Sequence, residues 1–242
     1  KTANLLREEG VPVVTLPKTI DNDLWGTDIT FGFQSAVDIA ANVIDCIHTT
    51  ATSHGRIFCV EIMGHKVGWL PLYAGIAGGA DVILLPEIPY DIDKIAKTLD
   101  YRIANGKKFS ILAVAEGALS KEEVAMKKKD FKKARAEMKY PSIVYRLADE
   151  LASRVDNEIR VCVPGHFQRG GSPCAYDRVL STQFGVHAAQ LIRDEIYGVT
   201  VALDGNEIIH NKLKDIAGVP KPVPKDDHVL TTARNMGICM GD

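Results

Sequence analysis

Residues 17–23 gather four side chains that suit phosphate chemistry: Lys18, Thr19, Asp21 and Asp23. A lysine neutralises phosphate oxygens, one aspartate can accept a hydroxyl proton, and another can orient a hard cation such as Mg²⁺. The same residue types also favour an Asx-turn or a helix cap, because Asp and Asn side chains bond nearby backbone groups. The pattern of residues leaves the catalytic and the structural interpretation equally open.

A second segment, residues 160–173, carries Arg160, His166 and Arg169 with glycines on both sides. Guanidinium and imidazole groups donate hydrogen bonds to phosphate oxygens, and glycines let the backbone approach a ligand closely. This composition predicts a compact anion receptor. A lone histidine on a loop is usually structural, so the interpretation of His166 depends on Arg169 and the glycines beside it.

Two further segments could contact a substrate. Residues 61–69 place Met63, Gly64, His65 and Lys66 at a turn, although Met63 could equally belong to the core. Glu116 could bind sugar hydroxyls, although one glutamate at a strand end is more often a cap or a surface residue. The chain contains neither G-x-G-x-x-G nor G-x-x-x-x-G-K-[ST], which excludes the standard dinucleotide and P-loop sites.

The elements that must position these side chains alternate between strands and helices. Short β-branched runs predict buried parallel strands, and apolar residues at helical spacing predict the helices between them. This alternation indicates an α/β fold with a parallel sheet, in which ligands bind beyond the carboxyl ends of the strands. The predicted strands are residues 11–16, 57–61, 81–85, 110–115 and 159–163, and the predicted helices include residues 32–50, 92–103, 143–155 and 176–195.

Composition excludes several classes of function. The 242 residues carry a formal net charge of -2, which gives no general attraction to nucleic acid or anionic membranes. Residues 121–139 hold eight Lys or Arg among four acids, and we interpret them as a solvated helix face without chemistry. No apolar stretch suits a membrane span or a signal peptide, and we expect a cytoplasmic protein. Five scattered cysteines argue against a disulfide framework or a zinc site.

Residues 17–23, the Met63–Gly64 turn and residues 165–173 together resemble the phosphofructokinase family, in its order and at its approximate spacing. The similarity runs over residues 11–189. The resemblance implies two three-layer α/β/α lobes with mostly parallel sheets. It places residues 1–32 in a lobe that binds the phosphoryl donor, and residues 33–165 in a lobe that binds fructose 6-phosphate. Residues 166–242 would return to the donor lobe and form a C-terminal connection.

The resemblance also implies an activity and a role for each residue. The expected reaction is the glycolytic transfer of a phosphoryl group to the C1 hydroxyl of fructose 6-phosphate, assisted by Mg²⁺. Asp21 is then the general base, Asp23 helps to position Mg²⁺, and Thr19 contacts the transferring phosphate. Met63, Gly64 and Glu116 are expected to hold the sugar, and His65 is a further expected substrate contact. His166 and Arg169 are expected to bind the 6-phosphate, joined by Arg56 and Arg160 from a neighbouring subunit of a dimer or tetramer.

Two departures from the family pattern matter. Many members have an arginine at the position of His65, so either Lys66 compensates or charge is stabilised differently. The family's donor-phosphate loops, including a Gly-Gly-Asp segment, do not occur in this chain, and we expect it to be a fragment that holds the acceptor site.

The phosphoryl donor is either ATP or pyrophosphate, and Lys18 favours pyrophosphate because a lysine here is typical of pyrophosphate-dependent members. One alternative is a non-catalytic module that binds sugar phosphates. Another is a nucleotide-binding α/β protein of unrelated chemistry, which would bind ATP without binding a sugar phosphate.

Overall fold

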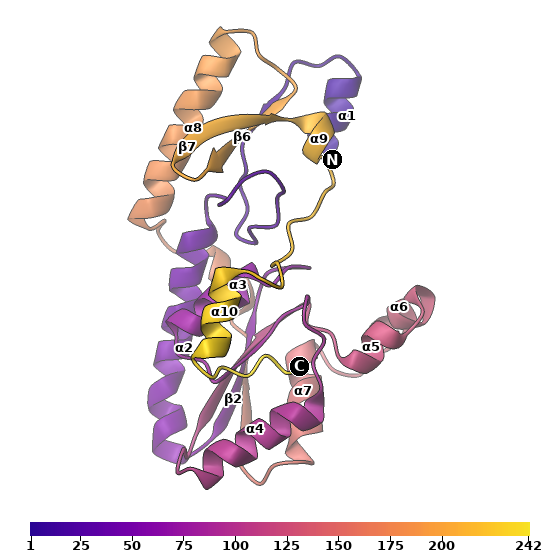
Figure 1. The fold of residues 1–242 in the computed structure, drawn as a ribbon, viewed down its shortest axis with the longest axis vertical. Helices are drawn as coiled ribbons and strands as arrows, with labels where there is room; N and C mark the ends of the chain where they lie inside the picture. Colours follow the sequence, from indigo (N-terminus) through magenta and orange to yellow (C-terminus); the bar gives the residue numbers. More distant parts are fainter. The chain divides into compact units, whose positions relative to one another are not determined.

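The computed structural model describes residues 1–242 and divides the chain into two compact units. The first unit consists of Lys1–Ala36 and Gly171–Lys221, and the second of Val37–Gly170 and Pro222–Asp242. Figure 1 shows the helices and strands of both units, coloured along the sequence. None of the helices combines the length and the apolar character that a membrane span requires.

A three-stranded sheet in the order β1-β6-β7 forms the centre of the first unit. β1 and β6 are parallel, whereas β6 and β7 form an antiparallel hairpin. This hairpin was not predicted from the sequence, although the Gly205-Asn206 pair between its strands is a recognised hairpin turn signal. The elements are α1 (Thr2–Glu8), β1 (Val14–Thr15), α8 (Ala175–Arg193), β6 (Val199–Asp204), β7 (Glu207–Lys212) and α9 (Leu213–Ile216).

Helix α8 packs against this sheet and also binds the N-terminal end of α2 (Phe33–His54). Leu180, Phe184 and Leu191 of α8 are buried against the strands. The carboxylate of Asp177, only 2% exposed, accepts hydrogen bonds from the N–H groups of Gly32 at 2.8 Å and Ser35 at 2.7 Å. Because the first N–H groups of a helix have no partner within it, Asp177 satisfies donors that α2 would otherwise leave unpaired.

The second unit is built on a four-stranded sheet in the order β3-β4-β2-β5, and all its strand pairs are parallel. Every residue of β4 is buried, as expected for a parallel strand covered on both faces. The elements are β2 (Ile57–Ile62), α3 (Trp69–Ala77), β3 (Val82–Leu84), α4 (Ile92–Ala104), β4 (Ser110–Ala115), α5 (Lys121–Ala125), α6 (Lys128–Ala136), α7 (Ile143–Ala152), β5 (Ile159–Cys162), the short 3₁₀ helix η1 (Gly165–Arg169) and α10 (His228–Asn235).

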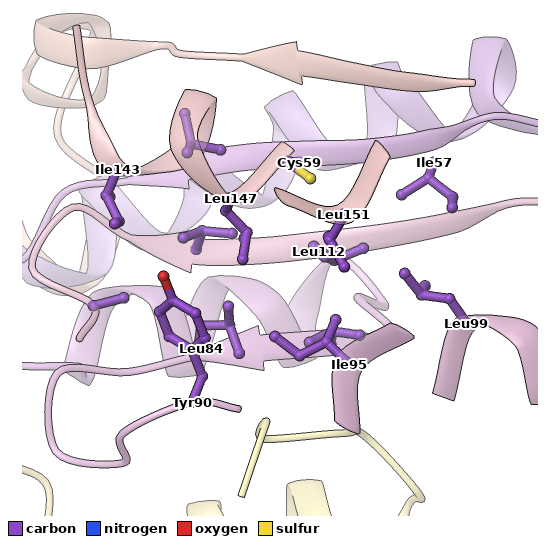
Figure 2. Packing of buried hydrophobic residues seen from close by; sticks show 14 of the residues in the cluster. Ile57, Cys59, Leu84, Tyr90, Ile95, Leu99, Leu112, Ile143, Leu147 and Leu151 are labelled. Carbon is purple, nitrogen blue, oxygen red and sulfur yellow. The ribbon is translucent and has the colours of Figure 1, made fainter. Parts of the chain in front are cut away.

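Helices cover both faces of this sheet, which confirms the expected three-layer α/β/α arrangement for the second unit. On one face, Leu99 of α4 and Leu147 and Leu151 of α7 pack against Ile57 and Leu112 of the strands (Figure 2). Burying each such side chain contributes roughly 1.5–3 kcal/mol. On the other face α3 packs against β3 and β4.

The limits of the two units differ from the expected lobe boundaries. The sequence placed the crossings after residues 32 and 165, whereas the structure places them after Ala36 and Gly170. The chain enters the second unit again at Pro222, within the stretch expected to form the C-terminal connection. The physical reason is pairing with this unit: the Val223 N–H donates to the Glu87 carboxylate at 2.9 Å, and Cys239 forms a parallel bridge with Val82.

Residues 121–139 form two short helices, α5 and α6, with mostly exposed side chains, in agreement with the predicted solvated face. One residue, Glu123, is an exception because it is 6% exposed. Its carboxylate accepts hydrogen bonds from Arg135 at 2.6 Å and Arg146 at 2.8 Å, and it caps α5 in a box with Ser120. Burial raises the pKa of Glu123, but these hydrogen bonds outweigh burial and lower the pKa to about 2.

Candidate active site

The first unit holds Lys18, Thr19, Asp21 and Asp23 on a loop that follows β1. The base of this loop is closed by hydrogen bonds between its two ends. The Phe31 N–H donates to the Pro17 carbonyl at 3.2 Å, and the Thr30 hydroxyl donates to the Thr19 carbonyl at 2.8 Å.

Within the loop, Thr19 and Asp21 contact each other directly. The Asp21 N–H donates to the Thr19 hydroxyl at 3.2 Å, and this hydroxyl lies 3.4 Å from the Asp21 carboxylate and donates to it. The structure therefore brings the expected base and the expected phosphate contact together. Lys18 is exposed and Asp23 is half-buried on the same loop.

Asn22, which the sequence analysis did not single out, sets the direction of the two flanking carboxylates. Its backbone has φ 53°, a left-handed conformation that asparagine tolerates better than most residues. Its side chain is 3% exposed, accepts the Thr30 N–H at 3.1 Å and donates to the Asp28 carbonyl at 3.3 Å. This turn separates Asp21 from Asp23, so the two carboxylates do not follow one another on a regular strand.

Lys221 is another functional candidate that the sequence did not reveal. Its ammonium group donates to the Thr27 carbonyl at 2.9 Å and to the Asn22 side chain at 3.3 Å, and its N–H donates to the Asp23 carbonyl at 3.0 Å. The available signal was its position between Pro220 and Pro222, where the backbone is stiff. Lys221 thus braces the loop that carries both carboxylates.

The second unit holds the Met63–Gly64–His65 turn directly after β2. Gly64 has φ 148°, and a Cβ added there would lie 2.6 Å from the Val67 carbonyl oxygen, so this position requires glycine. Glu116 leaves the neighbouring strand β4, and its Oε1 accepts the N–H groups of Gly64 at 3.3 Å and His65 at 2.7 Å. The carboxylate of Glu116 therefore fixes the turn, while Oε2 takes part in neither bond.

The 3₁₀ helix η1 presents His166 and Arg169 after β5, and both side chains are exposed. Gln168 between them is 1% exposed and connects η1 to the end of β2. Its Oε1 accepts the Met63 N–H at 3.1 Å, and its Nε2 donates to the Gly165 carbonyl at 3.2 Å. The structure thus brings the Met63 turn, Glu116 and the His166–Arg169 pair to the carboxyl ends of three neighbouring strands.

Glu61, the penultimate residue of β2, is a buried carboxylate near the Met63 turn. It is 9% exposed and accepts the Val144 N–H at 3.3 Å. Burial raises the pKa of Glu61, because few groups replace the water that would solvate its charge, and the charge of Glu116 raises it further.

Within one chain, Arg160 lies apart from His166 and Arg169. The residue pattern grouped these three side chains in one anion receptor, whereas the family resemblance assigns Arg160, like Arg56, to the site of a neighbouring subunit. Arg160 lies inside β5, beside Phe58 near the start of β2, and its side chain forms an ion pair with Glu158. Arg56 precedes β2 and forms an ion pair with the same glutamate. Because the six residues of β2 span roughly 20 Å, both arginines lie at the end of the sheet opposite the Met63 turn.

Comparisons with known proteins agree with this architecture. A family model described as phosphofructokinase matches residues 1–192. The chain is 52% identical over 242 residues to an ATP-dependent 6-phosphofructokinase from Spirochaeta thermophila, covering 100% of this chain and 66% of that protein. The chain thus spans about two thirds of the length of the curated relatives it matches.

Solved structures show the same fold. Phosphofructokinase from Saccharomyces cerevisiae matches with a TM-score of 0.73 and 32% identity, over 85% of this chain and 26% of that chain. A pyrophosphate-dependent phosphofructokinase from Nitrosospira multiformis matches with a TM-score of 0.79 over 100% of this chain and 64% of that chain. Its identity is 19%, so this second likeness concerns the fold alone.

Proposed function

Because the chain belongs to the phosphofructokinase family, we propose that its protein transfers a phosphoryl group to the C1 hydroxyl of fructose 6-phosphate, giving fructose 1,6-bisphosphate. The observation that carries this proposal is the 52% identity over the full chain to an enzyme named ATP-dependent 6-phosphofructokinase. Each unit by itself carries groups that such a reaction needs: carboxylates and a lysine in the first unit, and exposed cationic side chains in the second.

Asp21 is the proposed general base for the C1 hydroxyl, and the hydroxyl of Thr19 at 3.4 Å helps to orient its carboxylate. The exposed Lys18 supplies positive charge beside the transferring phosphate. Asp23 is the proposed Mg²⁺ ligand. One carboxylate completed by substrate phosphates suits Mg²⁺, which is commonly held by one or two carboxylates together with substrate phosphates. When bound, Mg²⁺ neutralises charge on the phosphoryl oxygens.

The second unit is the proposed fructose 6-phosphate lobe. His166 and Arg169 are exposed and without an ion pair, and Gln168 fixes the helix that presents them, so they suit the 6-phosphate. Met63, Gly64 and Glu116 are the proposed sugar contacts. The Oε2 of Glu116 can accept a hydrogen bond from a sugar hydroxyl. His65 contacts the transferred phosphate in place of the arginine found in many members.

Arg56 and Arg160 serve a neighbouring subunit in this proposal. Both lie roughly 20 Å along β2 from the Met63 turn, too far to contact the same phosphate in one chain. Their ion pairs with Glu158 hold them at the far end of the sheet. A homo-oligomer in which this end meets the 6-phosphate site of another subunit gives both arginines a function.

For the donor we propose ATP, which replaces the preference for pyrophosphate that Lys18 suggested. The 52% identical relative is named as ATP-dependent, whereas the pyrophosphate-dependent structure is 19% identical. Assays with each donor at equal concentration test this choice, and faster turnover with pyrophosphate would contradict it.

The function is tested by Asp21→Asn in the protein that contains this chain. Removing a general base should lower kcat by about 10² to 10⁴, with little change in KM for fructose 6-phosphate. Asp45→Asn is the matched control, because Asp45 is exposed on α2 and lies outside both loops. If Asp21→Asn lowers kcat by less than about tenfold, Asp21 is not the general base. Binding of fructose 6-phosphate without transfer from either donor would instead support the non-catalytic binding module.

A further inference from the structure

A cleft of about 620 Å³ in the first unit is not used by the proposed function. It is bounded by α1, β7 and α9 and by the loops before β1 and β6, and all its lining residues belong to this unit. Its volume is within the range of small-molecule sites in proteins.

The cleft lies at the end of the sheet opposite the Asp21 loop. Val11 comes before β1 and Tyr197 comes before β6, whereas Asp21 follows β1. β1 and β6 are parallel, so the segments before them meet at one end of the sheet and the segments after them at the other. No residue assigned to phosphoryl transfer lines this cleft.

The charged lining of the cleft is entirely basic. Arg7 of α1, His210 and Lys212 of β7 and Lys214 of α9 line it, and no Asp or Glu does. Neither lysine forms a salt bridge, whereas Arg7 is paired with Glu8 at 3.3 Å. Because His210 and Lys212 are two residues apart on a strand, their side chains leave the same face. Two unpaired ammonium groups beside a guanidinium favour a ligand with more than one negative charge.

His210 is held in place by a second histidine. Its Nδ1 lies 3.3 Å from the Nε2 of His187 on α8, and the ring centroids are 5.5 Å apart. Such a contact needs one ring nitrogen to donate and the other to accept. The pair fixes the imidazole at the wall of the cleft and provides a spectroscopic marker for any ligand that binds there.

The remaining lining is largely apolar and accessible to solvent. Val11, Ile196 and Tyr197 are 42%, 39% and 42% exposed, although large apolar side chains gain free energy when they are covered. An exposed aromatic ring next to unpaired cations suits a ligand with an apolar or aromatic body and a charged end.

From these observations we propose that the cleft binds an organic polyphosphate with an aromatic body, the chemistry of a nucleoside diphosphate. Lys212 and Lys214 bind the phosphate oxygens, with Arg7 and His210 beside them, and Tyr197 and Val11 cover the aromatic body. This site is additional to the proposed function, and its failure leaves that function unaffected because the two share no residue.

The test titrates the protein with ADP and, separately, with pyrophosphate, and follows the imidazole NMR signals of His187 and His210. These signals are assigned with His187→Gln and His210→Gln. We expect saturable shifts of the His210 signal, with ADP binding about tenfold more tightly than pyrophosphate, because only ADP covers apolar surface. Unmoved histidine signals, or equal affinity for the two probes, would overturn the proposal.

Two variants locate the ligand. Lys212→Met with Lys214→Met should weaken ADP binding by about tenfold or more, since charge-assisted hydrogen bonds are lost. Lys128→Met with Lys129→Met on α6 makes the same charge change on an exposed helix and should have no effect. Tyr197→Leu should weaken ADP binding and leave pyrophosphate binding unchanged. It keeps the proposal testable if the double lysine variant fails to fold, and an ADP affinity unchanged by Tyr197→Leu would contradict it.

Discussion

Asn22 is predicted to stabilise the loop that carries Asp21 and Asp23 in two separate ways, through its backbone conformation and through its side chain. The substitution Asn22→Ala removes both contributions. A left-handed backbone costs an alanine roughly 1–2 kcal/mol. Loss of the side chain leaves the N–H of Thr30, a residue that is 0% exposed, without its acceptor, which costs roughly 1–3 kcal/mol more. We therefore expect Asn22→Ala to lower the free energy of unfolding by about 2–5 kcal/mol.

The substitution Asn22→Gly separates the two contributions, because glycine adopts φ 53° without strain but lacks the amide. The free energy of unfolding of Asn22→Gly should be about 1 kcal/mol higher than that of Asn22→Ala. Urea unfolding followed by fluorescence measures both, and Trp25 is a local reporter because it lies in the same loop and is 52% exposed. The chain has two tryptophans, so a background with Trp69→Phe leaves Trp25 as the single emitter.

Two outcomes would refute this reasoning. If Asn22→Ala lowers the stability by less than about 1 kcal/mol, the buried hydrogen bond to Thr30 does not hold the loop. If Asn22→Gly and Asn22→Ala are equally unstable, the left-handed backbone carries no cost for alanine.

Two other predictions concern buried carboxylates. The pKa of Glu123 is lowered to about 2 in the folded chain, because its hydrogen bonds with Arg146, Ser120 and Arg135 outweigh burial. Their contribution to stability is complete above pH ~4.5 and is lost as the pH falls toward 2, and we expect about 3 kcal/mol. Acid unfolding compared with Glu123→Gln measures it, and equal acid profiles would contradict it. Asp177→Ala should lower the free energy of unfolding of the first unit by roughly 2–4 kcal/mol, because the N–H groups of Gly32 and Ser35 lose their acceptor. Asp177→Asn should lower it less, and urea unfolding measures both variants. A decrease of under ~0.5 kcal/mol for Asp177→Ala would show that the cap is dispensable.

Much of the fold follows from local patterns in the sequence. The β-branched runs predicted the strands of the second unit within about two residues, because a parallel strand covered on both faces must be apolar along its length. Glycine at position 64 and the acidic residues after β1 likewise marked one candidate loop in each unit. These signals are local, since each depends on a few consecutive residues and on the period of one element.

The partners that hold the site together were decided by the tertiary structure. The bond from the Met63 N–H to Gln168 joins residues 105 positions apart, and that from Lys221 to Asn22 joins residues 199 positions apart. The residue pattern grouped Arg160 with His166, whereas the register of β5 on β2 places Arg160 beside Phe58, near the start of β2. Only the family resemblance assigned Arg160 to a neighbouring subunit. Side chains that are distant in sequence meet only when strands pair and helices pack, and no local period encodes which of them will do so.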